Sequence, residues 1–144
     1  MRNSSEIVII DTGFIVALFN ERDEHHGLVK SVAEKIECYH WYTTSFVIQE
    51  IFWLLVKRIN RTMALKFLET IQSFLLLPEL PHDWYQRMLK VLKQYSSAGI
   101  DMADASLVLL ADQLGTGNIV SVDRKDFTIL RWNSSKNLFF NLLY

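Results

Sequence analysis

Two short apolar runs, far apart in the sequence, each end at an aspartate. Residues 7–10 read Ile-Val-Ile-Ile and precede Asp11, and residues 119–122, apolar except for Ser121, precede Asp123. Continuous apolar, β-branched runs of this length are typical of strands buried on both faces of a parallel sheet. Because the active sites of such sheets gather outside the carboxyl ends of the strands, we expect Asp11 and Asp123 to face one crevice.

The segments between these runs alternate between helical and extended patterns. Strands that alternate with helices predict an α/β fold of three layers, α/β/α, with a mostly parallel central sheet and helices on both faces. No Pro/Gly/Ser-rich stretch divides the chain, so we expect one domain over residues 1–144. We expect helices over residues 12–19, 23–36, 44–59, 63–74, 84–95 and 102–114, and further strands over residues 39–43, 75–77 and 138–143.

The composition predicts a folded protein of the cytoplasm. Half of the residues are hydrophobic and 22% are charged, which provides enough apolar surface for a core. The apolar runs are much shorter than the ~20 residues that a membrane-spanning helix needs. The single cysteine, Cys38, cannot form an internal disulfide, as is usual in a reducing compartment.

Two further acids are candidates for the same crevice. Glu50 lies in the strongly apolar stretch of residues 46–56, and a buried carboxylate is costly without a partner. Asp101 and Asp104 are three residues apart, so they share one face at the start of a helix. We assign the N-cap to Asp101 and the site to Asp104, which would lie in the first helical turn.

Carboxylates gathered in one crevice call for a cation. Two of them ~5 Å apart repel by about 3 kcal/mol at an effective dielectric near 20. Oxygen ligands without a Cys or His cluster favour a hard metal, Mg²⁺ or Mn²⁺. Such a site commonly activates water for attack on a phosphodiester. The sequence therefore predicts a metal-dependent nuclease with the catalytic acids Asp11, Glu50, Asp104 and Asp123.

Around these acids the sequence resembles the PIN-domain ribonucleases, in particular the VapC-like toxins of bacterial toxin–antitoxin pairs. Residues 7–19 are similar to the opening strand and first acid of that family. Residues 44–50 are similar to its second motif, residues 102–108 to its third and residues 120–127 to its fourth. The resemblance covers nearly the whole chain, and the motifs occur in the order that the family has them.

The resemblance implies roles for individual residues. Metal binding falls to Asp11, Asp104 and Asp123, while Glu50, together with Asp123, supports the metal or the attacking water. The small hydroxyl positions beside the acids correspond to Thr12, Ser45 and Ser121. The extra acids Asp101 and Asp126 could each replace a neighbouring acid. The family also implies cleavage of single-stranded RNA, a homodimer and a small antitoxin protein as partner.

The net charge of the chain does not predict a broad basic surface for binding RNA. The formal net charge is −1, whereas proteins that hold nucleic acid by charge alone are basic. RNA binding would depend on scattered cations, each of which could equally be an ordinary surface charge. The candidates are Arg22, Lys57, Arg58, Arg61, Lys125 and Arg131.

Other classes of protein remain as alternatives. Residues 11–13, Asp-Thr-Gly, match an aspartic protease signature, but that enzyme needs an all-β frame. The four histidines have no zinc-site spacing, and the four tryptophans are expected to pack in the core or at an interface. A catalytically silent PIN-like scaffold or binding module, and an RNA-processing nuclease without an antitoxin, both stay open.

Overall fold

The computed structural model describes residues 6–144, and its centre is a sheet of four parallel strands in the order β2-β1-β3-β6. The central strand, β1, pairs Ile9 with Tyr42 on one side and with Ile119 on the other. This arrangement confirms the predicted α/β fold with a parallel sheet. The strands are β1 (Ile7–Ile10), β2 (His40–Tyr42), β3 (Asn118–Val120) and β6 (Asn141–Leu142).

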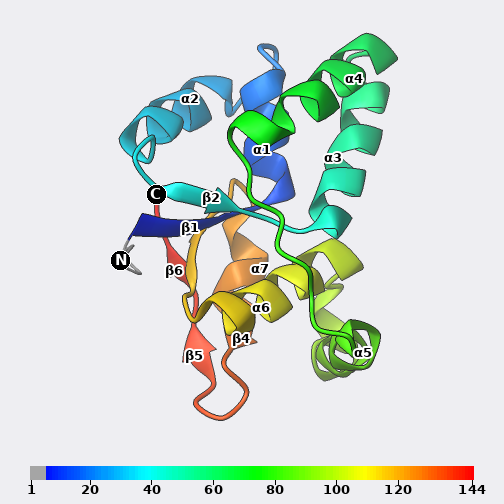
Figure 1. Ribbon diagram of the computed structural model, residues 1–144, viewed down its shortest axis with the longest axis vertical. Helices are drawn as coiled ribbons and strands as arrows, with labels where there is room; N and C mark the ends of the chain where they lie inside the picture. Colours follow the sequence, from blue (N-terminus) through cyan, green and yellow to red (C-terminus); the bar gives the residue numbers. More distant parts are fainter. Residues whose placement is uncertain (1–5) are drawn as a thin grey trace.

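Helices cover both faces of the sheet and complete the three layers. Figure 1 shows α1 and α2 on one side of the strands and α6 and α7 on the other. Helix α3 packs against α1, α4 and α6, and α5 packs against α6. The helices are α1 (Thr12–Phe19), α2 (His26–Lys35), α3 (Ser45–Arg58), α4 (Arg61–Thr70), α5 (Trp84–Gln94), α6 (Met102–Leu114) and α7 (Arg124–Ile129).

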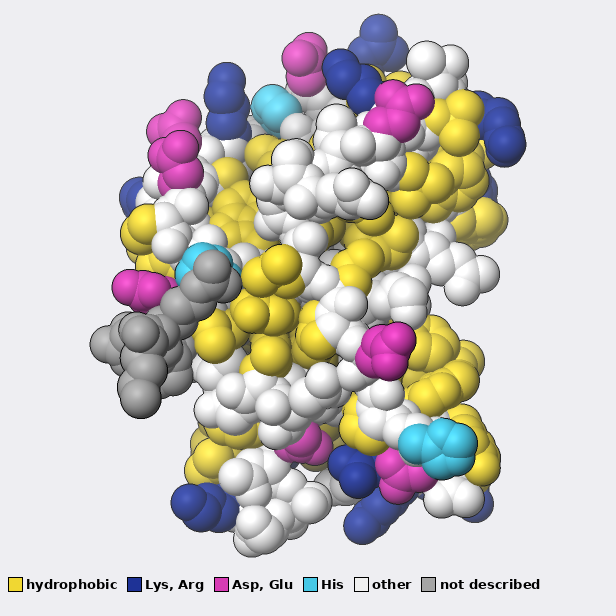
Figure 2. Space-filling model, in the orientation of Figure 1, with side chains coloured by type: hydrophobic (Ala, Val, Ile, Leu, Met, Phe, Trp, Pro, Cys, Tyr) yellow, Lys and Arg dark blue, Asp and Glu magenta, His cyan; other side chains and the backbone are white. Residues whose placement is uncertain are grey.

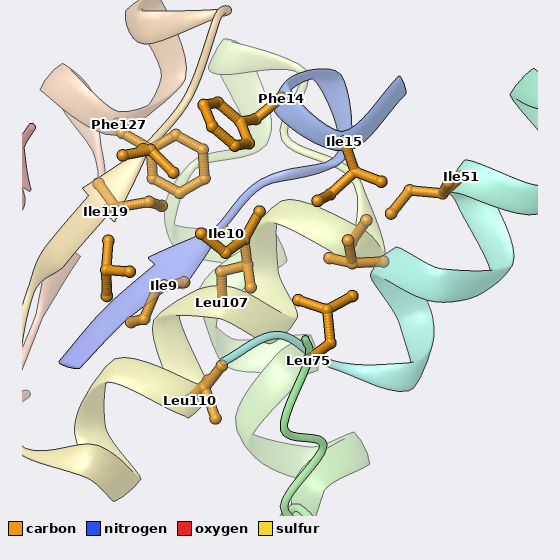
Figure 3. Packing of buried hydrophobic residues seen from close by; sticks show 14 of the residues in the cluster. Ile9, Ile10, Phe14, Ile15, Ile51, Leu75, Leu107, Leu110, Ile119 and Phe127 are labelled. Carbon is orange, nitrogen blue, oxygen red and sulfur yellow. The ribbon is translucent and has the colours of Figure 1, made fainter. Parts of the chain in front are cut away.

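The core explains why the first strand has no polar alternation. Val8, Ile9 and Ile10 are completely buried, since β1 has helices on both faces. Figure 3 shows Ile10 between Leu107 of α6 and Ile15 of α1. A strand that is apolar on both faces first reaches a polar environment where it ends, which is at Asp11.

Two predicted strands differ from what the structure shows. Residues 75–77 form only a single parallel bridge, between Leu76 and Tyr42, because Pro78 has no N–H to continue a ladder. The predicted edge strand over residues 138–143 is divided between two sheets. Strand β5 (Leu138–Phe139) pairs antiparallel with β4 (Arg131–Trp132), whereas β6 joins the main sheet.

The remaining differences concern helix and strand ends. Strand β3 ends at Val120, whereas the sequence predicted that this strand would continue to residue 122. Helix α7, which follows it, was not predicted. The helix expected over residues 63–74 is α4 followed by the short 3₁₀ helix η2 (Ile71–Ser73). None of the helices within residues 6–144 combines the length and the apolar character that crossing a membrane requires.

Candidate active site

Asp11 lies at the centre of the candidate site, at the junction of β1 and α1. Its side chain is 6% exposed and accepts hydrogen bonds from the backbone N–H of Thr12 and from the hydroxyl of Ser121, both at 2.7 Å. Burial raises the pKa of Asp11 to about 7; the two hydrogen bonds oppose this shift, and the charges of Glu50 and Asp101 add to it. Without a cation, Asp11 is therefore partly protonated at neutral pH.

Glu50 reaches the site from the second turn of α3. The hydroxyl of Thr12 donates to Glu50 Oε2 at 3.0 Å, which supplies the partner that a carboxylate in an apolar stretch needs. Burial raises the pKa of Glu50, and the charge of Asp101 raises it further. Thr12 thus connects Glu50 to Asp11, since its hydroxyl donates to Glu50 and its backbone N–H donates to Asp11.

Asp101 and Asp104 occupy the start of α6 as predicted. Asp101 is the N-cap, and its carboxylate accepts from the N–H of Asp104 at 2.9 Å. The side chain of Asp104 is half-buried in the first turn. Burial raises the pKa of Asp104 well above its ordinary value, and the charges of Asp11, Asp101 and Asp126 raise it further. Asp104 therefore holds its proton more tightly than an ordinary aspartate does.

Two acids of the fourth motif, Asp123 and Asp126, lie near the site. Asp123 contacts it through its backbone carbonyl and Asp126 through the charge of its side chain. Asp123 precedes α7, its side chain is exposed, and its backbone carbonyl lies 2.9 Å from the Ser121 hydroxyl. Asp126 lies in the first turn of α7, and its charge contributes to the raised pKa of Asp104. Burial raises the pKa of Asp126, and the charge of Asp123 adds to the shift. Asp126, which the sequence offers as a substitute for a neighbouring acid, is thus close enough to Asp104 for the two groups to interact.

Four helices begin at this group of acids. Asp11 caps α1, Asp101 caps α6, Asp123 precedes α7, and Glu50 lies near the start of α3. The N-terminus of a helix carries a partial positive charge and unpaired N–H groups, which favour carboxylates and phosphates. The fold therefore places Asp11, Asp101 and Asp104 at helix starts, where the helix dipoles offset part of their repulsion, while Glu50 lies one turn further along α3.

The donor set fits a hard divalent cation held partly by water. The groups at the site are carboxylates and hydroxyls; burial, and after it the charges of neighbouring acids, raises the pKa of the carboxyls, and a cation would favour their ionised form. Within residues 6–144, no three His, Cys, Asp or Glu side chains are arranged closely enough to enclose an ion. Mg²⁺ commonly binds through one or two carboxylates and keeps several waters, so a closed cage is not required.

A comparison with protein families identifies the fold. The model of the PIN domain matches residues 8–131, which include all of the acids described above. The chain belongs to the PIN-domain family. This finding agrees with the structure, in which Asp11-Thr12-Gly13 begins a helix of an α/β fold and so is not the loop of an all-β aspartic protease.

Individual PIN-domain relatives are similar along nearly their whole length. Ribonuclease VapC26 of Mycobacterium tuberculosis is 25% identical over 125 residues, which are 86% of this chain and 92% of the relative. The crystal structure of the sarcin–ricin loop cleaving toxin VapC20 of the same species has a TM-score of 0.75 at 18% identity and covers 93% of this chain and 98% of that one. VapBC2 of Rickettsia felis, bound to a promoter DNA fragment, has a TM-score of 0.65 at 16% identity, with 96% and 99% covered.

Buried hydroxyl groups of this PIN domain were only partly found from the sequence. Thr12 and Ser121 contact acids, but Ser45 is exposed and, within the described chain, its hydroxyl has no hydrogen-bond partner. The preceding Thr44 is buried instead and contacts Ser106 of α6. An N-cap role for Thr44 is predictable from its position before α3, whereas a partner 62 residues away is not.

A close backbone approach also shapes the site. A Cβ atom placed on Gly13, in the first turn of α1, would lie 2.5 Å from Cγ2 of Val122. Glycine at position 13 therefore allows α1 to lie against the segment that follows β3. That segment includes Ser121, whose hydroxyl donates to Asp11.

The predicted RNA-binding cations are not gathered around the acids. Lys125 is exposed on α7 and lowers the pKa of the neighbouring Asp126. The guanidinium of Arg131 donates to three backbone carbonyls at the end of α7 and stacks on Phe139, 3.5 Å from its ring centroid. The other four follow α1 or lie where α3 ends and α4 begins, remote from the helix starts at the acids; they are Arg22, Lys57, Arg58 and Arg61.

Proposed function

We propose that this PIN-domain protein is a metal-dependent endoribonuclease that cleaves single-stranded RNA and acts as the toxin of a toxin–antitoxin pair. The observation that carries the proposal is the convergence of acids from four segments at the carboxyl end of the central strand β1. The names of two similar proteins, a ribonuclease and a toxin that cleaves the sarcin–ricin loop, support it.

Asp11, Asp104 and Asp123 are the proposed ligands of Mg²⁺ or Mn²⁺, with Asp101 and Asp126 as substitutes for a neighbouring acid. The bound ion would activate a water and offset the charge that develops on the phosphate. The chain contributes the geometry: Ser121 and the N–H of Thr12 orient the carboxylate of Asp11. The hydroxyl of Thr12 also orients Glu50, which is the proposed acceptor of the proton from the attacking water.

The phosphodiester itself is an anion, and the helix N-termini at the site favour it. Single-stranded RNA can bring its scissile phosphate to the starts of α6 and α7, where Lys125 provides a cation at the rim of the acids. This arrangement accounts for RNA binding by a chain whose net charge is −1. The broad basic surface of a general nucleic-acid binder is not required.

Cleavage of RNA tests this proposal most directly. Purified protein is incubated with single-stranded RNA in the presence of Mg²⁺, Mn²⁺ or EDTA, and Asp11→Asn is compared with Asp112→Asn. Asp112 is also a carboxylate with a pKa raised by burial, but it contacts Asn133 at the far end of α6. We expect metal-dependent cleavage that Asp11→Asn abolishes and Asp112→Asn preserves. Equal cleavage by both variants would contradict the proposal.

Two similar solved structures motivate the proposed protein partners. VapBC2 of Rickettsia felis and VapBC of Salmonella typhimurium were both solved with bound DNA. We propose that this chain likewise pairs with a small antitoxin and forms a homodimer. Exposed apolar side chains on α3 and α4, including Trp53, Leu65 and Leu68, are available for such contacts; Figure 2 shows hydrophobic atoms on the visible surface of this region.

The alternatives have different signatures. A scaffold module would bind RNA or a protein without cleaving RNA in any metal. A processing nuclease would cleave RNA but would lack an adjacent reading frame whose product co-purifies with it and inhibits cleavage. Sedimentation of the isolated chain measures its oligomeric state independently of both.

A further inference from the structure

A chain of buried hydroxyl groups joins the helix that carries Glu50 to the helix that carries Asp104. Thr44 is the N-cap of α3, and Ser106 lies in the second turn of α6. Their side-chain oxygens are 2.6 Å apart, and the two residues are 1% and 0% exposed. This contact therefore ties together two helix starts that are remote in sequence.

The direction of each hydrogen bond in this chain follows from its ends. The carbonyl of Ala103 can only accept, so the Ser106 hydroxyl, 2.6 Å away, donates to it. Ser106 Oγ then accepts from the hydroxyl of Thr44, and Thr44 Oγ1 accepts from the N–H of Val47 at 3.3 Å. No buried side-chain nitrogen or oxygen among residues 6–144 lacks a partner. Each hydroxyl of this hydrogen-bond chain thus donates one bond and accepts another, from the N–H of Val47 to the carbonyl of Ala103. Removal of either hydroxyl interrupts the hydrogen-bond chain.

The same segment is also fixed to the central strand. The hydroxyl of Thr43 donates to the carbonyl of Ile10 at 2.8 Å, one residue before Asp11. Thr43 and Thr44 together therefore connect the end of β1, the start of α3 and the start of α6. Each of these three segments carries an acid of the candidate site: Asp11, Glu50 and Asp104 respectively.

We propose that Thr44 and Ser106 are positioning residues that fix the separation of Glu50 and Asp104 during RNA cleavage; the inference rests on the proposed function. Ionised carboxylates at neighbouring helix starts repel one another. A satisfied hydrogen-bond chain in a low-dielectric interior opposes that repulsion. Because catalytic groups misplaced by ~1 Å can lose about 100-fold in rate, a small separation of α3 from α6 would be costly.

The test compares hydroxyl deletions at this contact with the same deletion elsewhere. Ser106→Ala and Thr44→Val each break the chain, while Thr44→Ser keeps the hydroxyl. Ser73→Ala is the matched control, because Ser73 also donates to the carbonyl three residues earlier, at 2.6 Å, but lies exposed in η2. Each variant is measured for kcat and KM on single-stranded RNA with Mg²⁺, for Mn²⁺ affinity by electron paramagnetic resonance, and for thermal unfolding.

We expect Ser106→Ala and Thr44→Val to lower kcat about tenfold or more, with KM nearly unchanged and with weaker Mn²⁺ binding. Thr44→Ser and Ser73→Ala should resemble the wild type. A lower melting temperature with unchanged kcat and Mn²⁺ affinity would overturn the inference, because the hydroxyls would then only stabilise the fold. If the wild type cleaves no RNA but its Mn²⁺ affinity depends on Ser106, the proposed function fails and the positioning role holds. Absence of Mn²⁺ binding by the wild type would overturn both.

Discussion

The hydroxyl of Ser121 donates to Oδ2 of Asp11 at 2.7 Å across 110 residues of sequence. The contact exists because β1 and β3 are neighbours in the sheet, and the N–H of Asp11 is itself 3.2 Å from the carbonyl of Val120. Two strands that end side by side thus bring the first and last motifs of the chain together.

Ser121→Ala is expected to impair the reaction at neutral pH more than at high pH. The Ser121 hydrogen bond lowers the pKa of Asp11 against the effect of burial, so its loss raises that pKa further. The acid limb of the pH profile of kcat/KM should move to higher pH, with about a tenfold loss at pH 7. Thr128→Ala removes a hydrogen bond from an exposed hydroxyl to the backbone carbonyl of Lys125, and it should leave the profile unchanged. A uniform loss at all pH values would contradict this role of Ser121.

The metal-free protein should become less stable as the pH rises from about 4 towards 7. Burial raises the pKa of Asp11 from 3.8 to about 7, so between these values the folded state holds a proton that the unfolded state releases. The stability present below the lower pKa is then lost as the pH rises through the upper one, by up to about 4 kcal/mol for Asp11. Urea unfolding in EDTA measures this dependence. Asp11→Asn should reduce the slope without abolishing it, because the pKa of Asp104 is raised as well; an unchanged slope would show that Asp11 ionises normally.

Gly13→Ala is expected to destabilise the protein and to separate Ser121 from Asp11. The added Cβ would lie 2.5 Å from Val122, so α1 or the segment after β3 must move. We expect a loss of about 1–3 kcal/mol in the free energy of unfolding, as for other overpacked sites. Gly27→Ala in α2 is the control, since a Cβ there has nothing within 4 Å, and it should gain up to ~1 kcal/mol. Equal stability of the two variants would refute the close approach.

Lys125→Ala should weaken binding of RNA, whereas Arg61→Ala should not. Lys125 lies beside Asp126 at the start of α7, and Arg61 begins α4, away from the acids. Loss of one phosphate contact should raise KM severalfold and reduce the salt dependence of binding by about one unit of slope. Titration of a fluorescent RNA at several salt concentrations measures both. A larger effect of Arg61→Ala would place the RNA over α3 and α4 instead.

The position of Asp11 directly after a buried strand could be predicted because it is a local feature of the sequence, whereas Asp123 does not directly follow a strand, since β3 ends at Val120. An apolar run that stops at an aspartate marks both the end of a buried strand and the edge where parallel strands meet. The N-cap role of Asp101 was predictable for the same reason, since capping depends on residues within one helical turn. The α/β fold followed from the alternation of these local patterns.

The relationships that the sequence did not reveal are set by tertiary packing. Whether Asp123 or Asp126 approaches Asp104 depends on α7, a short helix without a strong apolar periodicity. The Thr44–Ser106 contact depends on how α3 packs against α6. The end of the chain was also misjudged, because the predicted strand over residues 138–143 pairs with β4 as far as Phe139 and with β3 from Asn141 onwards, and such partners are not visible in the local sequence.

Calorimetric titration with Mg²⁺ or Mn²⁺ tests the central claim, that acids from separate helix starts share one cation, most directly. Asp104→Asn and Asp112→Asn provide the comparison, since both residues are carboxylates of α6 with raised pKa values. We expect the wild type and Asp112→Asn to bind the metal with similar affinity and Asp104→Asn to lose at least tenfold in affinity, about 1.4 kcal/mol. Equal binding by all three proteins would contradict the central claim.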